Sequence, residues 1–338
     1  MKTTVLLINL GTPDSPSTSD VRSYLRQFLN DPRVIDLPWL VRKILVNLII
    51  VPFRAPKSAK IYQQLWTEQG SPILLHGRNV QAALQERLGD GFRVELAMRY
   101  KHPSIPETLE RIRRSATDRI IVLPLFPQYA SASSGSALQA VMDEVRKWWV
   151  IPEVHFISQY WDHPGFAAAL LDRAREYDWQ DYDHVLFSYH GLPERQVDKV
   201  YDNGLCQDRD CEHEITPENT YCYKATCYGT SRLLAEGLGI PEDRYTVCFQ
   251  SRLDKKWLEP FADEMVEAQA RKGARKLLVF SPSFVADCLE TTIEIGHEYQ
   301  ELFVEHGGEK IQLVESLNDH PAWIEALASL VEDSPTRQ

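Results

Sequence analysis

The sequence predicts an α/β protein built from two similar halves. Short, continuously apolar segments rich in Val, Ile and Leu alternate with helical patterns along the 338 residues. Apolar segments of this kind are typical of strands buried on both faces, and their alternation with helices favours parallel sheets with right-handed crossovers. A third observation gives the number of halves, because the strand-like segments of the first half recur in the second.

The internal repeat links four pairs of segments. Residues 5–11 resemble 185–191, residues 94–99 resemble 246–252, residues 121–126 resemble 277–282, and residues 162–166 resemble 319–323. The last two pairs are separated by nearly the same number of residues. We therefore expect an N-terminal half over residues 1–160, a C-terminal half over 161–317, and a C-terminal helix and tail over 318–338.

The helical pattern is clearest near the N-terminus. Apolar side chains recur at helical spacing after Ser and Asp residues that are suited to capping, at Val21, Tyr24, Leu25, Phe28 and Leu29. In sheets of this class, ligands bind beyond the carboxyl ends of the strands. Polar residues at those ends are therefore the functional candidates, and two halves would enclose a cleft.

Composition excludes several functional classes. The 37 basic and 48 acidic residues give a net charge of −11, which argues against a general nucleic-acid binder. No apolar segment reaches the ~20 residues of a membrane-spanning helix, and the N-terminus lacks the pattern of a secretory signal. We expect a cytoplasmic protein, in which six cysteines would be thiols or metal ligands rather than disulfides. No Gly-x-Gly-x-x-Gly follows the first strand, which disfavours a dinucleotide oxidoreductase.

Seven motifs at the expected strand ends resemble signatures of the ferrochelatase family. They lie at residues 9–13, 70–72, 99–100, 124–129, 188–193, 249–252 and 287–291, in the order found in the family. The resemblance implies two Rossmann-like halves, each a four-stranded parallel sheet flanked by helices, with a porphyrin in the cleft between them. It also implies a lyase of haem biosynthesis that inserts Fe²⁺ into protoporphyrin IX and releases two protons.

Iron insertion needs a base that removes the pyrrole protons, and His190 ends a strand-like segment. An imidazole has an intrinsic pKa near ~6.5, so it can accept a proton or ligate iron at neutral pH. A structural role at a sheet edge is the alternative for an isolated histidine. The surrounding motif at 188–193 favours the catalytic role, and the resemblance implies that His190 also ligates the substrate iron.

Three carboxylates form a second candidate feature. Glu290, Glu294 and Glu298 are spaced four residues apart, which places them on one face of a helix. Like charges stacked in this way repel, so they add no stability, although a solvated surface helix could tolerate them. The resemblance implies that Glu290 is the catalytic, iron-binding carboxylate, and it supports Glu294 and Glu298 as a path for metal and protons.

A porphyrin also requires apolar walls and a cation for its propionates. By resemblance, the porphyrin-binding residues are Leu10, Arg99, Tyr100 and Phe249, with Arg99 as the anchor. Each of the apolar ones could equally belong to a core. Residues 37–53 resemble the mobile lip that covers the pocket in the family, and an ordinary buried helix is the alternative. Peripheral contact of the lip with a membrane is compatible with this pattern, whereas insertion is not.

A polar insert at residues 202–227 carries a C-x4-C-x10-C-x4-C array formed by Cys206, Cys211, Cys222 and Cys227. The insert has too few apolar residues to form a core of its own, so a metal bound by four thiolates would have to order it. The spacing alone does not choose between zinc and an iron–sulfur cluster. Structural zinc usually has C-x2–4-C pairs, so the x4 pairs here are at its upper limit, whereas iron–sulfur clusters accept looser spacings. The array resembles that of a subset of bacterial ferrochelatases, which implies a [2Fe–2S] cluster.

Two other functional classes compete with iron insertion into protoporphyrin. One is a chelatase for another metal or tetrapyrrole, inserting iron into coproporphyrin or cobalt into a related ring. The other is a haem or metal carrier without turnover. The ordered motifs favour iron and a porphyrin as substrates, while the residues leave the number of propionates and the oligomeric state open.

Overall fold

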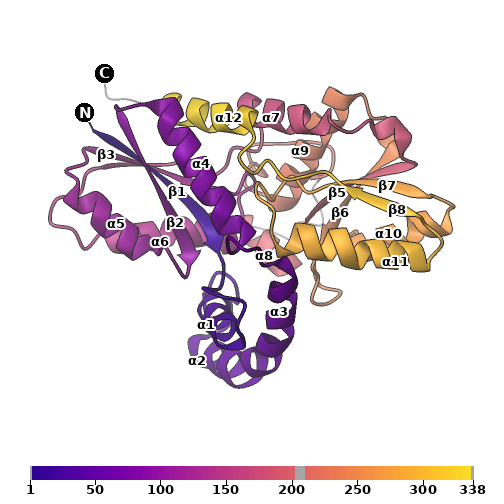
Figure 1. The fold of residues 1–338 in the computed structure, drawn as a ribbon, viewed down its shortest axis with the longest axis horizontal. Coiled ribbons are helices and arrows are strands. Elements are labelled where there is room, and N and C mark those ends of the chain that lie inside the picture. The colour runs from indigo at the N-terminus through magenta and orange to yellow at the C-terminus, as the bar shows by residue number, and fades with distance from the viewer. Residues whose placement is uncertain (1, 202–209, 336–338) are drawn as a thin grey trace. The chain divides into compact units, whose positions relative to one another are not determined.

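The structure is a computed structural model that describes residues 2–201 and 210–335 (Figure 1). Its internal contacts group Met1–Phe126, Ser131–Gln159 and Leu327–Gln338 into one compact unit, and Pro127–Ala130 with Tyr160–Ala326 into another. We call these unit 1 and unit 2. None of the helices in the described residues combines the length and the apolar character that a membrane crossing requires.

Unit 1 contains a four-stranded parallel sheet in the order β2-β1-β3-β4. Its strands are β1 (Thr3–Gly11), β2 (Phe92–Tyr100), β3 (Arg119–Pro124) and β4 (Glu153–Phe156). Strand β1 is buried on both faces, as its unbroken apolar sequence predicts: its side chains from Val5 to Ile8 have no exposed surface.

The helices of unit 1 begin where the sequence offers caps. The Ser17 hydroxyl accepts a hydrogen bond from the Asp20 amide at the start of α1, and Ser104 with Glu107 forms a capping box at α5. The helical segments are α1 (Thr18–Leu29), α2 (Trp39–Ile44), η1 (Leu45–Ile50), α3 (Val51–Leu65), α4 (Pro72–Leu88), α5 (Ile105–Arg114), η2 (Ser131–Gly135) and α6 (Ser136–Val145).

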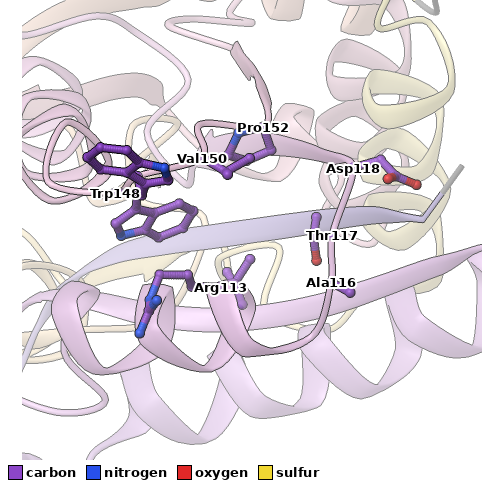
Figure 2. A pocket seen from close by; sticks show the side chains of 9 residues that line it. Arg113, Ala116, Thr117, Asp118, Trp148, Val150 and Pro152 are labelled. Atoms are coloured by element: carbon purple, nitrogen blue, oxygen red, sulfur yellow. The ribbon is translucent and has the colours of Figure 1, made fainter.

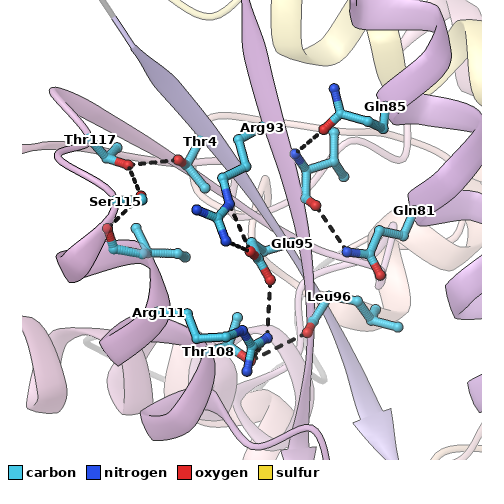
Figure 3. A network of polar contacts seen from close by, with 12 residues as sticks. Thr4, Gln81, Gln85, Arg93, Glu95, Leu96, Thr108, Arg111, Ser115 and Thr117 are labelled. Atoms are coloured by element: carbon cyan, nitrogen blue, oxygen red, sulfur yellow. Dashed lines mark hydrogen bonds and ion pairs between the residues drawn. The ribbon is translucent and has the colours of Figure 1, made fainter. Parts of the chain in front are cut away.

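Polar side chains tie these helices to the outer strand β2 (Figure 3). Gln81 donates to the carbonyl of Val94 and Gln85 accepts from its amide, each at 2.9 Å, so two backbone groups on the free edge of the sheet are satisfied by α4. The buried Glu95 carboxylate pairs with Arg93 and with Arg111 of α5. This network holds the edge strand in place on both sides.

Unit 2 repeats the architecture with the order β6-β5-β7-β8, again all parallel. Its strands are β5 (His184–His190), β6 (Tyr245–Gln250), β7 (Lys276–Phe280) and β8 (Lys310–Leu313). Its helical segments are α7 (Pro164–Ala174), η3 (Trp179–Asp181), α8 (Glu194–Val197), η4 (Asp198–Val200), α9 (Tyr223–Leu238), η6 (Glu242–Arg244), α10 (Ala262–Arg271), η7 (Glu290–Tyr299) and α11 (Gln300–Glu305). The last helix, α12 (Pro321–Glu332), is divided between the units: its residues up to Ala326 belong to unit 2 and those from Leu327 to unit 1. The predicted pair of α/β halves with four-stranded parallel sheets is confirmed.

Candidate functional site

The carboxyl end of β5 in unit 2 presents His190. The sheet register pairs His190 with Gln250, the last residue of β6. The half-buried imidazole meets two aromatic rings edge-on, Trp257 at 6.5 Å and Phe284 at 6.3 Å between ring centroids. No described residue forms a hydrogen bond with this imidazole, so both ring nitrogens remain available to a substrate.

Gln250 connects this strand end to the helical segment that carries the carboxylates. Its side-chain oxygen accepts a hydrogen bond from Ser188 at 2.8 Å. Its side-chain nitrogen donates to the backbone oxygen of Glu290 and to the carboxylate of Glu294, both at 3.0 Å. Because Gln250 is almost fully buried, this amide has one fixed orientation, and η7 is held at the end of β6.

The segment η7 is wound as a π-helix over ten residues. The residue pattern of this segment predicts an ordinary helix, because the periodicity of its side chains does not reveal the wider winding. π-helical turns are rare and are frequently found at functional sites. In this segment Glu290 and Glu294 are half-buried and Glu298 is exposed. The exposure of the three carboxylates therefore increases toward the C-terminal end of η7.

Glu294 is the most firmly held of the three carboxylates. It accepts hydrogen bonds from the Gln250 amide at 3.0 Å, the Ser251 backbone amide at 2.8 Å, the Ser251 hydroxyl at 2.5 Å and the Tyr299 hydroxyl at 3.0 Å. A carboxylate offers about four acceptor positions, so those of Glu294 are filled. Ser251 itself has a left-handed backbone conformation, with φ of 62°, and Glu294 binds both of its donors.

Glu298 and Cys288 show how the surroundings act on ionisable groups nearby. Partial burial, together with the charges of Glu294 and Glu301, raises the pKa of Glu298 above its usual range. The pKa of the Cys288 thiol is also raised, first by burial and then by the charge of Glu290. Sequence alone indicates only an ordinary thiol at Cys288, and its contact with the predicted catalytic carboxylate Glu290 becomes visible only in the structure.

The corresponding strand ends of unit 1 carry a different group of residues. The buried Asp31 accepts three hydrogen bonds on one oxygen, from Arg99 and Ser136 at 2.6 Å and from the Tyr100 hydroxyl at 2.9 Å. The charge of Arg99 is therefore balanced within unit 1. Burial, followed by the charge of Asp31, raises the pKa of Tyr100 far above its usual value, which keeps its hydroxyl protonated.

The four predicted porphyrin-binding residues lie at different depths. Leu10 and Arg99 are half-buried at the ends of β1 and β2. Tyr100 and Phe249 are fully buried, each in an apolar core cluster of its own unit. Asp31 and Ser136, which fix Arg99 and Tyr100, were missed by the sequence analysis because no local motif marks them.

Two hollows lie at opposite edges of the unit 1 sheet. A pocket of about 640 Å³ follows the carboxyl ends of β1 and β2 and includes the motif residues Thr12 and Ser71. A pocket of about 460 Å³ lies at the other edge, where Asp118 and Pro152 precede β3 and β4, and Trp148 forms part of its wall (Figure 2). Only the first is at the edge where sheets of this class bind ligands.

Three cysteines of the predicted array lie in the described residues. Cys211, Cys222 and Cys227 are buried in one apolar cluster of unit 2, and the Tyr201 hydroxyl lies 3.4 Å from the Cys211 sulfur. Cys206 lies outside the described residues. Within the described ranges, no three His, Cys, Asp or Glu side chains form a group that could hold a metal ion. The soft, buried donor set nevertheless suits zinc or an iron–sulfur cluster.

Comparison with known proteins assigns the chain to a family. The family model described as Ferrochelatase matches residues 2–334. The chain is 42% identical to the ferrochelatase of Pseudomonas putida over 333 residues, covering 97% of this chain and 98% of that protein. It is 44% identical to the ferrochelatase of Legionella pneumophila (strain Lens), covering 98% and 99%.

A solved structure supports the same fold. SirB from Bacillus subtilis, determined with Fe³⁺, superposes with a TM-score of 0.57 at 12% sequence identity, covering 98% of this chain and 95% of that one. At this identity the likeness concerns the fold alone. The match of the family model over nearly the whole chain, together with the identity to full-length relatives, shows that the chain belongs to the ferrochelatase family.

Proposed function

We propose that this protein is a ferrochelatase that inserts Fe²⁺ into protoporphyrin IX to form protohaem, with release of two protons. The observation that carries the proposal is the family match over residues 2–334 in a chain that keeps an unpaired imidazole beside a carboxylate-bearing helix. Iron and the porphyrin are substrates of this reaction and leave together as product.

His190 is proposed to accept pyrrole protons and to ligate the entering iron. In the reaction, two pyrrole N–H bonds break, all four ring nitrogens bind the iron, and the two protons pass to a base and then to solvent. The rings of Trp257 and Phe284 form an apolar wall beside His190. Glu290, held by Gln250 through its backbone oxygen, is proposed as the second ligand and proton acceptor.

The path to Glu290 is proposed to start at Glu298. Glu298 is exposed and has no hydrogen bond to a described residue, so its oxygens can meet a hydrated cation. Glu294, which the sequence analysis also places on the path, has its acceptor positions filled by protein donors. We assign to Glu294 a holding role, in which its oxygens fix η7 to Ser251.

The four cysteines Cys206, Cys211, Cys222 and Cys227 are proposed to hold a [2Fe–2S] cluster. Support comes from the burial of the three described cysteines in one apolar core region and from the resemblance to ferrochelatases that contain a [2Fe–2S] cluster. When bound, the cluster would cross-link the insert. Burial raises the pKa of the Cys227 thiol.

The cluster proposal is tested by metal analysis. The protein purified without oxygen should be brown, with two irons and two acid-labile sulfides per chain, and Cys222→Ser should bleach it. The matched control is Cys248→Ser, because Cys248 is also a buried cysteine of unit 2 and lies outside the array. A colourless protein with one zinc per chain would refute the cluster and leave iron insertion untouched.

The lip is proposed to touch membranes peripherally. Large apolar side chains are exposed along α2, η1 and the start of α3, at Trp39, Leu40, Val41, Ile44, Leu48, Ile49 and Phe53. They are accompanied by Lys43, Arg54 and Lys57, and the combination fits an anionic lipid surface. The wild-type protein should sediment with anionic vesicles, and a Leu48→Ser, Phe53→Ser variant should not. Equal sedimentation of both proteins would contradict the lip as the contact.

The overall function is tested by anaerobic insertion assays. The protein is mixed with Fe²⁺ and either protoporphyrin IX or coproporphyrin, and haem formation is followed by the shift of the Soret band. We expect turnover with Fe²⁺ and a preference for protoporphyrin. A preference for coproporphyrin or for Co²⁺ would support the corresponding alternative chelatase, and tight haem binding without turnover would support a carrier.

A further inference from the structure

Unit 1 contains two arginines near the carboxyl edge of its sheet, and they differ in how their charge is balanced. Arg99 forms an ion pair with the buried Asp31 at 2.6 Å. Arg33, in the loop after α1, donates from Nε to the Gln139 side-chain oxygen at 2.5 Å and from Nη1 to the Ser131 hydroxyl at 2.8 Å. Both partners are neutral, and no carboxylate among the described residues pairs with the Arg33 guanidinium.

The geometry leaves Arg33 with donors to spare. A guanidinium carries five N–H donors in a planar fork, and the two contacts use one on Nε and one on Nη1. Three donors remain, including both on Nη2, and a carboxylate typically takes two parallel donors of such a fork. The Gln139 and Ser131 contacts fix the plane of the group, so little side-chain entropy is lost when a ligand binds.

The loop that carries Arg33 is also held. The Arg33 backbone amide donates to Asp31 at 2.8 Å, through the oxygen that Arg99 does not use. On the other side, the buried Arg42 donates to the carbonyl of Leu37 at 2.7 Å and to that of Ile35 at 3.3 Å. The loop is therefore attached to the rest of unit 1 on both sides of Arg33.

The position of Arg33 agrees with the known geometry of ligand binding to parallel sheets. Ser131 begins η2 and Gln139 lies in α6, both of which follow the carboxyl end of β3. Asp31, through Arg99 and Tyr100, contacts the carboxyl end of β2. Ligands bind at this edge, and a half-buried, unbalanced cation there attracts an anion more strongly than an exposed one would.

We propose that Arg33 is an anchor for a carboxylate on the rim of the porphyrin substrate. This proposal rests on the proposed function, since it supposes a porphyrin with carboxylate side chains. Arg99, by contrast, orders Asp31, Tyr100 and Ser136, and its pairing with Asp31 makes it the weaker candidate for that anchor.

The test compares a porphyrin dicarboxylic acid with its dimethyl ester, which lacks the negative charges. Porphyrin affinity is measured by fluorescence in the absence of iron, so that the outcome does not depend on turnover. Arg33→Gln should weaken binding of the diacid by roughly tenfold to a hundredfold and leave binding of the ester unchanged. Arg26→Gln, which removes the same charge from the exposed face of α1, is the matched control and should change neither.

Arg33→Lys guards against a variant that fails to fold, because it keeps the charge and loses the fork. It should bind the diacid with an affinity between those of wild type and Arg33→Gln. If Arg33→Gln weakens binding of the diacid and the ester equally, or weakens neither, the proposal is overturned. Arg33 then has only a structural role, in which it links its loop to α6. Failure of iron insertion with an intact diacid preference would refute the proposed function and retain the anchor.

Discussion

In unit 1 the sheet runs β2-β1-β3-β4 and in unit 2 it runs β6-β5-β7-β8, so the first strand of each unit lies between the second and the third. A glycine at the end of that first strand lies against the last carbonyl of its neighbour. A Cβ on Gly11 would be 2.0 Å from the oxygen of Tyr100, and one on Gly191 would be 2.8 Å from that of Gln250. The backbone of the strand ends is thus duplicated along with the sheets.

The side chains at these duplicated ends differ in kind. Leu10 precedes Gly11, whereas His190 precedes Gly191, and the neighbouring strand ends in Tyr100 in one unit and Gln250 in the other. Unit 1 gathers arginines, an aromatic ring and apolar surface, which suit the rim of an anionic macrocycle. Unit 2 gathers an imidazole and carboxylates, which suit a divalent cation and its protons. Under the proposed function, one scaffold would serve both tasks, and the residues at the strand ends would separate them.

The largest expected effect lies in unit 2. Glu290→Gln keeps the size of the side chain and removes its charge, so turnover should fall by ~10²-fold or more, while porphyrin affinity and folding stay within a few-fold of wild type. Insertion kinetics and porphyrin fluorescence measure the two. Glu301→Gln, one exposed carboxylate further along, is the control. A similar loss in both variants would mean that the charge of the whole helix matters rather than Glu290.

A second difference between the units concerns acid. His184 at the start of β5 is buried, its Nε2 lies 2.8 Å from the Thr246 hydroxyl, and its pKa is lowered to about 4, first by burial and then by Lys272 and Arg244. The unfolded chain holds a proton on this histidine below about pH 6.5. Between pH 6.5 and 4 the unfolded chain therefore binds a proton that the folded chain does not. The free energy of unfolding is highest above pH 6.5 and falls by up to about 3 kcal/mol as the pH drops toward 4.

The repeat aligns His184 with Thr4 of unit 1, which does not titrate. Hydrogen exchange should therefore show unit 2 opening more readily between pH 6.5 and 4, with a smaller change in unit 1. His184→Thr should remove most of this difference. If the variant and the wild type lose stability in parallel over that range, acid sensitivity arises elsewhere.

The smallest expected effect separates Glu294 from Glu298. Glu294→Gln replaces one of the two accepting oxygens with an amide nitrogen, so two of the four donors that bind Glu294 lose their acceptor. This should lower the free energy of unfolding by about 1–3 kcal/mol and reduce kcat with little change in the KM for Fe²⁺. Glu298→Gln should raise that KM and leave stability unchanged. Urea unfolding and iron titration measure the pair. Identical behaviour of the two variants would contradict the holding role of Glu294.

Much of the fold is predictable because it depends on local pattern. The apolar segments at residues 5–11 and 185–191 correspond to β1 and β5, and the helical spacing from Val21 to Leu29 predicts α1 and its buried face. Burial on both faces of a strand leaves a direct trace in the sequence. The repeat adds the number of sheets.

The connections within the site could not be predicted in the same way. Asp31, Arg99 and Ser136 are far apart in the chain and meet only through packing, and the hold of Ser251 on Glu294 depends on a left-handed backbone that no motif encodes. The anchor role inferred for Arg33 follows from the absence of an acidic partner in its described surroundings. Charge balance of this kind is a property of three-dimensional neighbours.

The division of tasks between the units is tested most directly by one anaerobic measurement on wild type and His190→Ala. Porphyrin binding is followed by fluorescence, haem formation by the Soret band, and proton release by an indicator dye in the same cuvette. The wild type should release two protons for each haem formed, and His190→Ala should bind porphyrin normally while forming haem ~10²–10⁴-fold more slowly. Turnover of the variant above about a tenth of wild type would contradict the account.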